Sequence, residues 1–166
     1  MADEMDRKDI EAKLWSAITD TRTGMLGLTG AEADHFQPMT AYVEADARTI
    51  WFYTRRDNDL LRRAAGGGRA MFNLVGKDHH VFACLAGEIT EQHDRERIDR
   101  YWNPVVAAWF PEGKDDPELT LIRFDVDDAQ VWISQKGPVR FAYEIAKANM
   151  TKSEPDVGDS THLQFH

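Results

Sequence analysis

The sequence predicts a mainly β protein, built as an antiparallel barrel that carries helical decorations. Strand-like segments follow one another across short turns, which gives about six or seven strands with three or four helices. The sequence lacks the alternation of strands and helices, with a glycine fingerprint, that a doubly wound nucleotide-binding fold requires. At 166 residues the chain is long enough to bury a core as one domain, expected over residues 1–150.

The N-terminal half is expected to begin with a helix and to continue as strands. Ile10, Leu14 and Ile18 recur every four residues, which predicts an amphipathic helix over Asp9–Ile18. Apolar runs bounded by turn residues predict strands at Thr23–Leu28, Pro38–Glu44, Thr49–Thr54, Ala70–Val75 and Val81–Thr90. A short helix over Asp59–Ala65 is expected to stop at the glycine run 66–68.

The C-terminal half is expected to mix helices with one further hairpin. Helices are predicted at Asp94–Trp102, Val105–Phe110 and Val139–Met150. Two apolar runs, Leu121–Val126 and Ala129–Ser134, flank Asp127-Asp128, a pair of residues typical of a turn, and so predict a hairpin. The polar tail over residues 151–166 is expected to be disordered.

Charge and composition restrict the partners. The formal net charge is −9, and such a surface repels a phosphate backbone, which disfavours a nucleic-acid partner. No apolar run approaches the ~18–20 residues that cross a bilayer, so no membrane partner is expected. The acidic start Met1–Asp6 does not resemble a signal peptide, and Cys84 is the single cysteine, expected to be buried and inert. A cytoplasmic location is therefore the expectation.

One long stretch, Tyr101 to Ser134, has Trp, Phe, Pro and Gly at distinctive spacings. Its motifs, together with two upstream ones, are Tyr101-Trp102-Asn103-Pro104, Trp109-Phe110-Pro111-Glu112-Gly113, Asp116-Pro117-Glu118-Leu119, Pro38-Met39-Thr40-Ala41 and Ile50-Trp51-Phe52-Tyr53-Thr54. With these motifs the chain resembles the general stress protein branch of the pyridoxamine 5'-phosphate oxidase-like, FMN-binding split-barrel family, over roughly Asp9 to Ser134. The resemblance implies a Greek-key split barrel of about six or seven antiparallel strands that works as a homodimer.

The resemblance also implies a flavin site. FMN is the expected cofactor, with FAD as the alternative. The residues expected to contact it are Met39, Thr40, Tyr53, Thr54, Arg55 and Trp132. Backbone groups of Met39 and Thr40 would line the flavin, and Thr54 and Arg55 would bind its phosphate or ribityl chain. Trp132 would approach the flavin of the partner subunit.

Two positions depart from the family pattern. The family often has a basic residue where this chain has Gln37, and a lysine near the position of Leu60. Each lost charged hydrogen bond would weaken phosphate binding by roughly 1.5–3 kcal/mol. Arg62, Arg63 and Arg69 are candidates to compensate.

The function implied by the resemblance is that of a flavin-dependent oxidoreductase of undefined substrate, with NAD(P)H as a candidate electron donor and no side chain identified as catalytic. The alternative is a non-catalytic flavin-binding or sensing module, which the departures at Gln37 and Leu60 favour. Residue types alone do not select either hypothesis, because threonine and arginine are common on strands. His79-His80 is expected to form a solvated turn rather than a metal site. The seven-residue spacing of Trp102 and Trp109 would allow them to share a helical face, and Trp102 is expected in the core.

Overall fold

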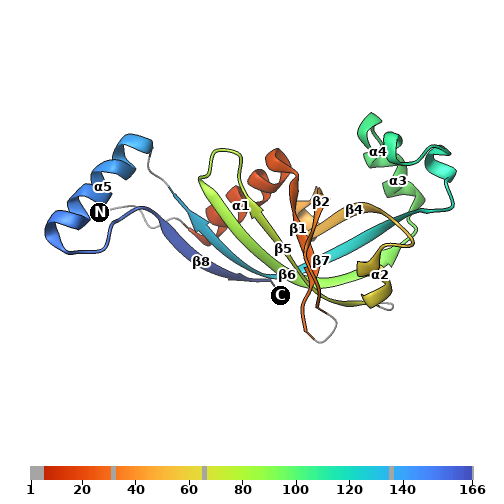
Figure 1. The fold of residues 1–166 in the computed structure, drawn as a ribbon, viewed down its shortest axis with the longest axis horizontal. Helices are drawn as coiled ribbons and strands as arrows, with labels where there is room; N and C mark the ends of the chain where they lie inside the picture. The colour runs from red at the N-terminus through yellow and green to blue at the C-terminus, as the bar shows by residue number, and fades with distance from the viewer. Residues whose placement is uncertain (1–5, 31–32, 65–66, 135–136, 166) are drawn as a thin grey trace.

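The computed structural model describes residues 6–30, 33–64, 67–134 and 137–165 as a curled antiparallel sheet with helices at its ends (Figure 1). In chain order the elements are α1 (Arg7–Thr21), β1 (Thr23–Leu28), β2 (Gln37–Thr40), β3 (Tyr42–Glu44), the 3-10 turn η1 (Ala45–Ala47), β4 (Thr49–Arg55), α2 (Asp59–Ala64), β5 (Gly68–Val75), β6 (Val81–Gln92), α3 (Arg95–Tyr101), α4 (Pro104–Trp109), the 3-10 turn η2 (Gly113–Asp115), β7 (Leu119–Ile133), α5 (Pro138–Thr151) and β8 (Asp159–Gln164). The prediction of a mainly β, antiparallel fold is confirmed.

The sheet closes on itself through a single residue. It is eight-stranded, in the order β2-β1-β5-β6-β7-β4-β3, and β8 is added on β7. The two end strands of this order, β2 and β3, are separated in sequence only by Ala41. The ends of the sheet must therefore meet, and the sheet curls into a barrel. The amide of Ala41 donates a hydrogen bond to the carbonyl of Arg22 (2.7 Å), which fixes the point where β2 passes into β3.

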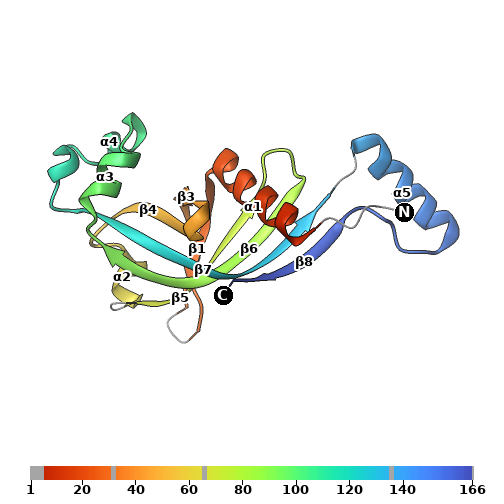
Figure 2. The same ribbon diagram turned by 180° about the vertical axis from the view of Figure 1, so that it is seen from behind.

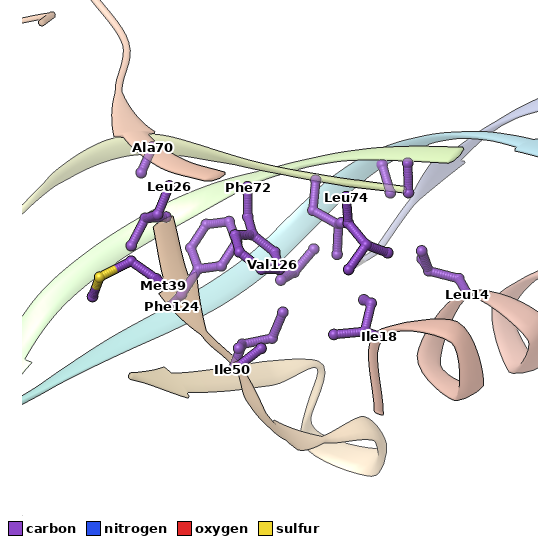
Figure 3. Close-up of a cluster of buried hydrophobic side chains, with 14 of the residues drawn as sticks. Leu14, Ile18, Leu26, Met39, Ile50, Ala70, Phe72, Leu74, Phe124 and Val126 are labelled. Atoms are coloured by element: carbon purple, nitrogen blue, oxygen red, sulfur yellow. The ribbon is translucent and has the colours of Figure 1, made fainter. Parts of the chain in front are cut away.

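The core fills the inside of the curled sheet, and α1 covers one end of it. Ile10, Leu14 and Ile18 are buried, as their spacing predicts. Figure 3 shows Leu14 and Ile18 beside apolar side chains from the strands, among them Phe72 and Phe124. Since these rings come from β5 and β7, the core joins strands that are far apart in the sequence.

The predicted hairpin at Asp127-Asp128 is wrong, because β7 runs unbroken through both residues. Ala86 on β6 faces Asp128, whereas Gly87 faces Val126, so Asp127 is the extra residue of a β-bulge. Asp127 accepts a hydrogen bond from Arg69 Nη2 (2.9 Å). Asp127 thus bonds to β5, on the far side of β6, instead of turning the chain.

The tail also differs from the prediction, because residues 159–164 form β8 rather than a disordered segment. The strand pairs with β7 from Asp128 to Ile133. Leu163 is buried in the core, and His162 pairs with Asp128. Two apolar residues of this polar tail, Leu163 and Phe165, pack against the core, and the free edge of β7 accepts the strand.

Two helical regions extend away from the sheet. The helices α3 and α4 form a lobe near the ends of β4 and β7, and α5 projects at the opposite end of the molecule (Figures 1 and 2). The α3–α4 lobe is fastened to β3 by Glu44, which accepts hydrogen bonds from Arg97 (3.0 Å) and from the hydroxyl of Tyr101 (2.8 Å). Among the described residues, no helix is both long and apolar enough to cross a membrane.

Candidate functional site

A cavity of about 360 Å³ lies between the strands β2, β3 and β4 and the helix α4. Its volume falls within the range of roughly 300–1,000 Å³ that is usual for small-molecule sites. Its lining residues are Pro38, Met39, Thr40, Tyr42, Tyr53, Thr54, Arg55, Asp57, Asn58, Val105, Val106, Trp109 and Phe110. The point where the sheet closes thus forms one wall, and the α3–α4 lobe forms the other.

All the predicted site residues except Trp132 line this cavity. On β2 the side chains alternate, so that Met39 packs into the core, whereas Thr40 is exposed. Met39 is therefore available to a ligand mainly through its backbone. On β4, Thr54 is 8% exposed, whereas Arg55 is at the exposed end of the strand.

Trp132 lies outside the cavity, on the part of β7 that pairs with β6 and β8. It is a direct cross-strand neighbour of Phe82, which in turn faces Val75. These three side chains are exposed by 46%, 39% and 47%, respectively, and we call them the outer apolar row. A contact between Trp132 and a flavin of the partner subunit stays a prediction.

Gln37 and Asn58 form a neutral amide pair beside the cavity. Asn58 Nδ2 donates to Gln37 Oε1 (2.9 Å), and Gln37 Nε2 donates back to Asn58 Oδ1 (3.3 Å). Asn58 Nδ2 also donates to Thr54 Oγ1 (2.9 Å), and Asn58 Oδ1 accepts from the amide of Leu60 (2.8 Å). The amide pair stands at one of the positions where the sequence departs from the family pattern.

The positive charge at the cavity comes from Arg55. Its guanidinium is half exposed and lies 3.4 Å from Asp57 and 3.9 Å from Glu118, so these ion pairs are weak and can exchange for a ligand anion. Leu60, where the family tends to have a lysine, is buried in the core.

The arginines that could compensate for the departures do not line this cavity. Arg62 pairs with Asp59, Arg63 with Asp34 (3.0 Å) and Arg69 with Asp127. Each guanidinium is therefore engaged by a carboxylate elsewhere on the surface. Arg62 and Arg63 lie on α2 and Arg69 lies on β5, whereas Arg55 is the arginine of the described cavity lining.

The wall formed by α4 was not predicted from the sequence. The two helices predicted here are confirmed as separate, because α3 ends at Tyr101 and Asn103 caps a new helix, so Trp102 and Trp109 do not share a helical face. Trp109 is 72% exposed and borders the cavity, whereas Phe110 is buried. The sequence signal for the break is Asn103-Pro104, an N-cap followed by proline at the first helical position.

Three tyrosines form a cluster at the cavity, and two of them, Tyr42 and Tyr53, line it. The rings of Tyr53 and Tyr101 lie 5.4 Å and 5.2 Å from the ring of Tyr42. The hydroxyl of Tyr53 donates to the carbonyl of Ile98 (2.6 Å), and burial raises the pKa of Tyr53 well above its usual range. Tyr53 is therefore a neutral part of the wall, and not an acid–base group.

His79, His80 and Cys84 lie away from this cavity. The two histidines are exposed in the turn between β5 and β6, and the backbone of His79 is left-handed (φ 59°). Cys84 is only partly buried, so the expectation of full burial is wrong. Its thiol lies 3.7 Å from Met71 Sδ, and burial raises the pKa of Cys84. A thiol with a raised pKa is a weak nucleophile near neutral pH.

Comparison with known proteins identifies the class. The curled antiparallel sheet is a split barrel of the kind seen in pyridoxamine 5'-phosphate oxidase-like proteins. The model of the family described as "Pyridoxamine 5'-phosphate oxidase like" matches residues 9–156. The chain belongs to this family, in its general stress protein branch. No curated protein sequence matches it.

Three solved structures show the similarity within the branch. A protein described as general stress protein 26 from Jannaschia sp. CCS1 is 34% identical, with a TM-score of 0.80 over 95% of this chain and 99% of that one. A general stress family protein from Xanthomonas campestris pv. campestris is 42% identical, with a TM-score of 0.73 over 80% and 92%. The general stress FMN/FAD binding protein from Xanthomonas citri is 42% identical, with a TM-score of 0.72 over 78% and 92%.

Proposed function

We propose that this protein binds FMN in the cavity between β2, β3, β4 and α4, and that it acts in the cytoplasm as a flavin-dependent oxidoreductase of undefined substrate. The observation that carries the proposal is the convergence of Met39, Thr40, Tyr53, Thr54 and Arg55 on one cavity. A 42% identical relative is described as an FMN/FAD binding protein, which supports a flavin and leaves FAD as the alternative.

The residues present fit a flavin. Thr54 and Arg55 both line the cavity at the end of β4, so a hydroxyl and a guanidinium are available to a phosphate. The opposite wall is apolar, with Val105, Val106 and Phe110 available to a flat ring system. Bound flavin would supply electron or hydride transfer, while the chain supplies binding and orientation. The titratable groups in the described lining are Tyr42, Tyr53, Arg55 and Asp57, and none is assigned a proton-transfer role.

A homodimer is part of the proposal. The outer apolar row of Val75, Phe82 and Trp132 leaves large side chains exposed on one face of the sheet, next to the exposed Met25. Such a continuous apolar face favours burial against another protein surface. A second copy of the chain offers the same face, as a two-fold symmetric interface requires.

A second candidate function is a flavin-binding or sensing module without catalysis. The neutral pair of Gln37 and Asn58 favours it, since this pair offers no charge to a phosphate. Turnover separates the two candidates. Oxidation of NADH or NADPH by the flavin-loaded protein supports the oxidoreductase, whereas flavin binding without such turnover supports the module.

The proposal of a flavin site is tested by titrating the protein with FMN, FAD and riboflavin and following the quenching of flavin fluorescence. We expect FMN to bind more tightly than riboflavin, because riboflavin lacks the phosphate that Arg55 and Thr54 would contact. Equal binding of FMN and riboflavin would contradict the phosphate assignment. The absence of binding for all three flavins would overturn the proposed function.

A further inference from the structure

The geometry points to Tyr42 as a ligand-binding residue of the cavity, a hydrogen-bond donor whose hydroxyl proton is directed toward the ligand by Asn103. The inference deepens the proposed function, because it names a further residue of the same site and the kind of ligand atom that this residue binds. It concerns a residue that the sequence motifs do not single out, and it is carried by the hydrogen bonds of Asn103.

The orientation of the Asn103 amide is fixed by the start of α4. Its Oδ1 accepts hydrogen bonds from the amides of Val105 (2.9 Å) and Val106 (3.2 Å), because Asn103 is the N-cap of this helix. Its Nδ2 must then face the other way, where it donates to the carbonyl of Tyr101 (3.0 Å) and to the hydroxyl of Tyr42 (2.8 Å). A flipped amide would lose the contacts to the amides of Val105 and Val106 and to the carbonyl of Tyr101, so these three contacts assign the orientation.

The Asn103 contact determines the role of the Tyr42 hydroxyl. Because an N–H group points at this oxygen, the oxygen acts as an acceptor there, and its own proton must lie in another direction. A phenolic proton lies near the plane of the ring, which leaves one main alternative position. Within the described part of the chain, no group accepts a hydrogen bond from Tyr42, although the residue is only 7% exposed and lines the cavity. The donor therefore faces the cavity, where a bound ligand can supply its acceptor.

The neighbouring tyrosines show the contrast. The hydroxyl of Tyr53 donates to the carbonyl of Ile98, and the hydroxyl of Tyr101 donates to Glu44. Both protons are therefore used within the protein. Among the contacts of the described residues, Tyr42 is the one tyrosine of this cluster whose hydroxyl does not donate a hydrogen bond.

The same arrangement occurs at the other end of the cavity. Asn58 Oδ1 accepts from the amide of Leu60 at the start of α2, and Asn58 Nδ2 donates to Thr54 Oγ1. Thr54, 8% exposed, likewise receives a hydrogen bond and keeps its own proton for another acceptor. Two asparagines at helix starts thus direct two cavity hydroxyls as donors. A ligand that uses both donors has two acceptor groups, an anionic one for Thr54 beside Arg55 and a carbonyl oxygen or ring nitrogen for Tyr42 beside Val106.

The test measures FMN affinity in variants that leave the fold intact. Tyr42→Phe removes the donor, and we expect it to weaken FMN binding about tenfold, the effect of losing one ligand hydrogen bond. Asn103→Asp keeps the helix cap but replaces the N–H donor with an acceptor, so the Tyr42 proton turns to Asp and away from the ligand. This variant is expected to lose affinity to a similar extent.

The double variant separates this mechanism from simple charge repulsion. If Asn103→Asp acts through the Tyr42 hydroxyl, the double variant with Tyr42→Phe binds FMN no more weakly than Tyr42→Phe alone. Additive losses would overturn the positioning role of Asn103. The matched control is Tyr143→Phe, which removes an exposed hydroxyl on α5, away from the cavity and from the contacts that hold the α3–α4 lobe, and which we expect to leave FMN affinity unchanged. Unchanged affinity in Tyr42→Phe would overturn the inference.

A second measurement keeps the inference testable if the proposed function fails. In the ligand-free protein, the exchange of tyrosine hydroxyl protons with water is followed by NMR. We expect fast exchange for Tyr42 and slow exchange for Tyr53 and Tyr101, and we expect Asn103→Asp to slow the exchange of Tyr42. Slow exchange of Tyr42 in the wild-type protein would show that its proton has an internal acceptor and would overturn the inference, whether or not FMN binds.

Discussion

Gln37 and Asn58 exchange hydrogen bonds through both of their amide groups, at 2.9 Å and 3.3 Å, beside the cavity. This closed pair occupies a position where the family often has a cation. Asn58 is also bonded to Thr54, so a charge placed at position 37 would lie close to the expected phosphate site. The neutral pair therefore adds no charge beside the expected phosphate site, where Arg55 supplies the cation.

Restoring a cation should strengthen binding. Gln37→Arg is expected to raise the affinity for FMN by about tenfold or more, since a charged hydrogen bond contributes roughly 1.5–3 kcal/mol. The gain should shrink with added salt, because part of it is electrostatic. Fluorescence titrations at low and high salt measure both effects. Gln37→Glu is the matched control and should weaken binding. The phosphate would have to lie elsewhere if both variants bound FMN like the wild type.

The link between β3 and the α3–α4 lobe should depend on pH. Hydrogen bonds from Arg97 hold the pKa of Glu44 below its ordinary value of 4.5, with a further contribution from Tyr101. A carboxylate with a lowered pKa stabilises the fold above its unfolded pKa, and this stability is lost as the pH falls through the folded pKa. Glu44→Gln is therefore expected to lower the free energy of unfolding by about 1.5–3 kcal/mol at pH 7, and by less below pH ~4.

Chemical denaturation across this pH range measures the effect. Glu96→Gln is the control, because Glu96 is an exposed residue paired with Arg100 along one helix, and such pairs contribute little. A difference between the wild type and Glu44→Gln that stayed constant from neutral to acid pH would contradict the account.

The outer apolar row provides a test of the homodimer. Phe82 lies at its centre, between Val75 and Trp132. Phe82→Glu would place a charge on each side of the two-fold interface, and we expect the protein to become monomeric in light scattering after size-exclusion chromatography. Gln92→Glu adds the same charge at an exposed position on the same strand and should leave the dimer intact. A dimer that survives Phe82→Glu would place the interface on another face.

The sequence predicts the elements that have strong local patterns. It fails where contacts between segments that are far apart in the sequence determine the structure. The four-residue spacing of Ile10, Leu14 and Ile18 was sufficient for α1, because one face of that helix is buried. Asp127-Asp128 was misread as a turn, because its partners Arg69 and His162 are far away in the sequence. A local pattern carries no information about such partners.

The candidate site likewise combines residues that local motifs predict with residues that matter only through distant contacts. Backbone and side-chain positions on β2 and β4 followed from the family motifs, and they do line one cavity. Tyr42, Asn58 and Asn103 were missed, because their importance lies in hydrogen bonds made across the fold. The arginines after Arg55 suggested a basic cluster, but each of Arg62 and Arg63 is paired with its own carboxylate.

The most direct test of the flavin site is the visible absorption spectrum of the purified protein after incubation with excess FMN and desalting, compared with Arg55→Ala. We expect the wild type to retain flavin at close to one per chain and Arg55→Ala to lose it, because Arg55 supplies the cation at the cavity. Arg56→Ala is the control, since Arg56 is exposed beside His93 and does not line the cavity. A wild type that keeps no flavin, or an Arg55→Ala variant that keeps as much as the wild type, would contradict the assignment of this cavity as the flavin site.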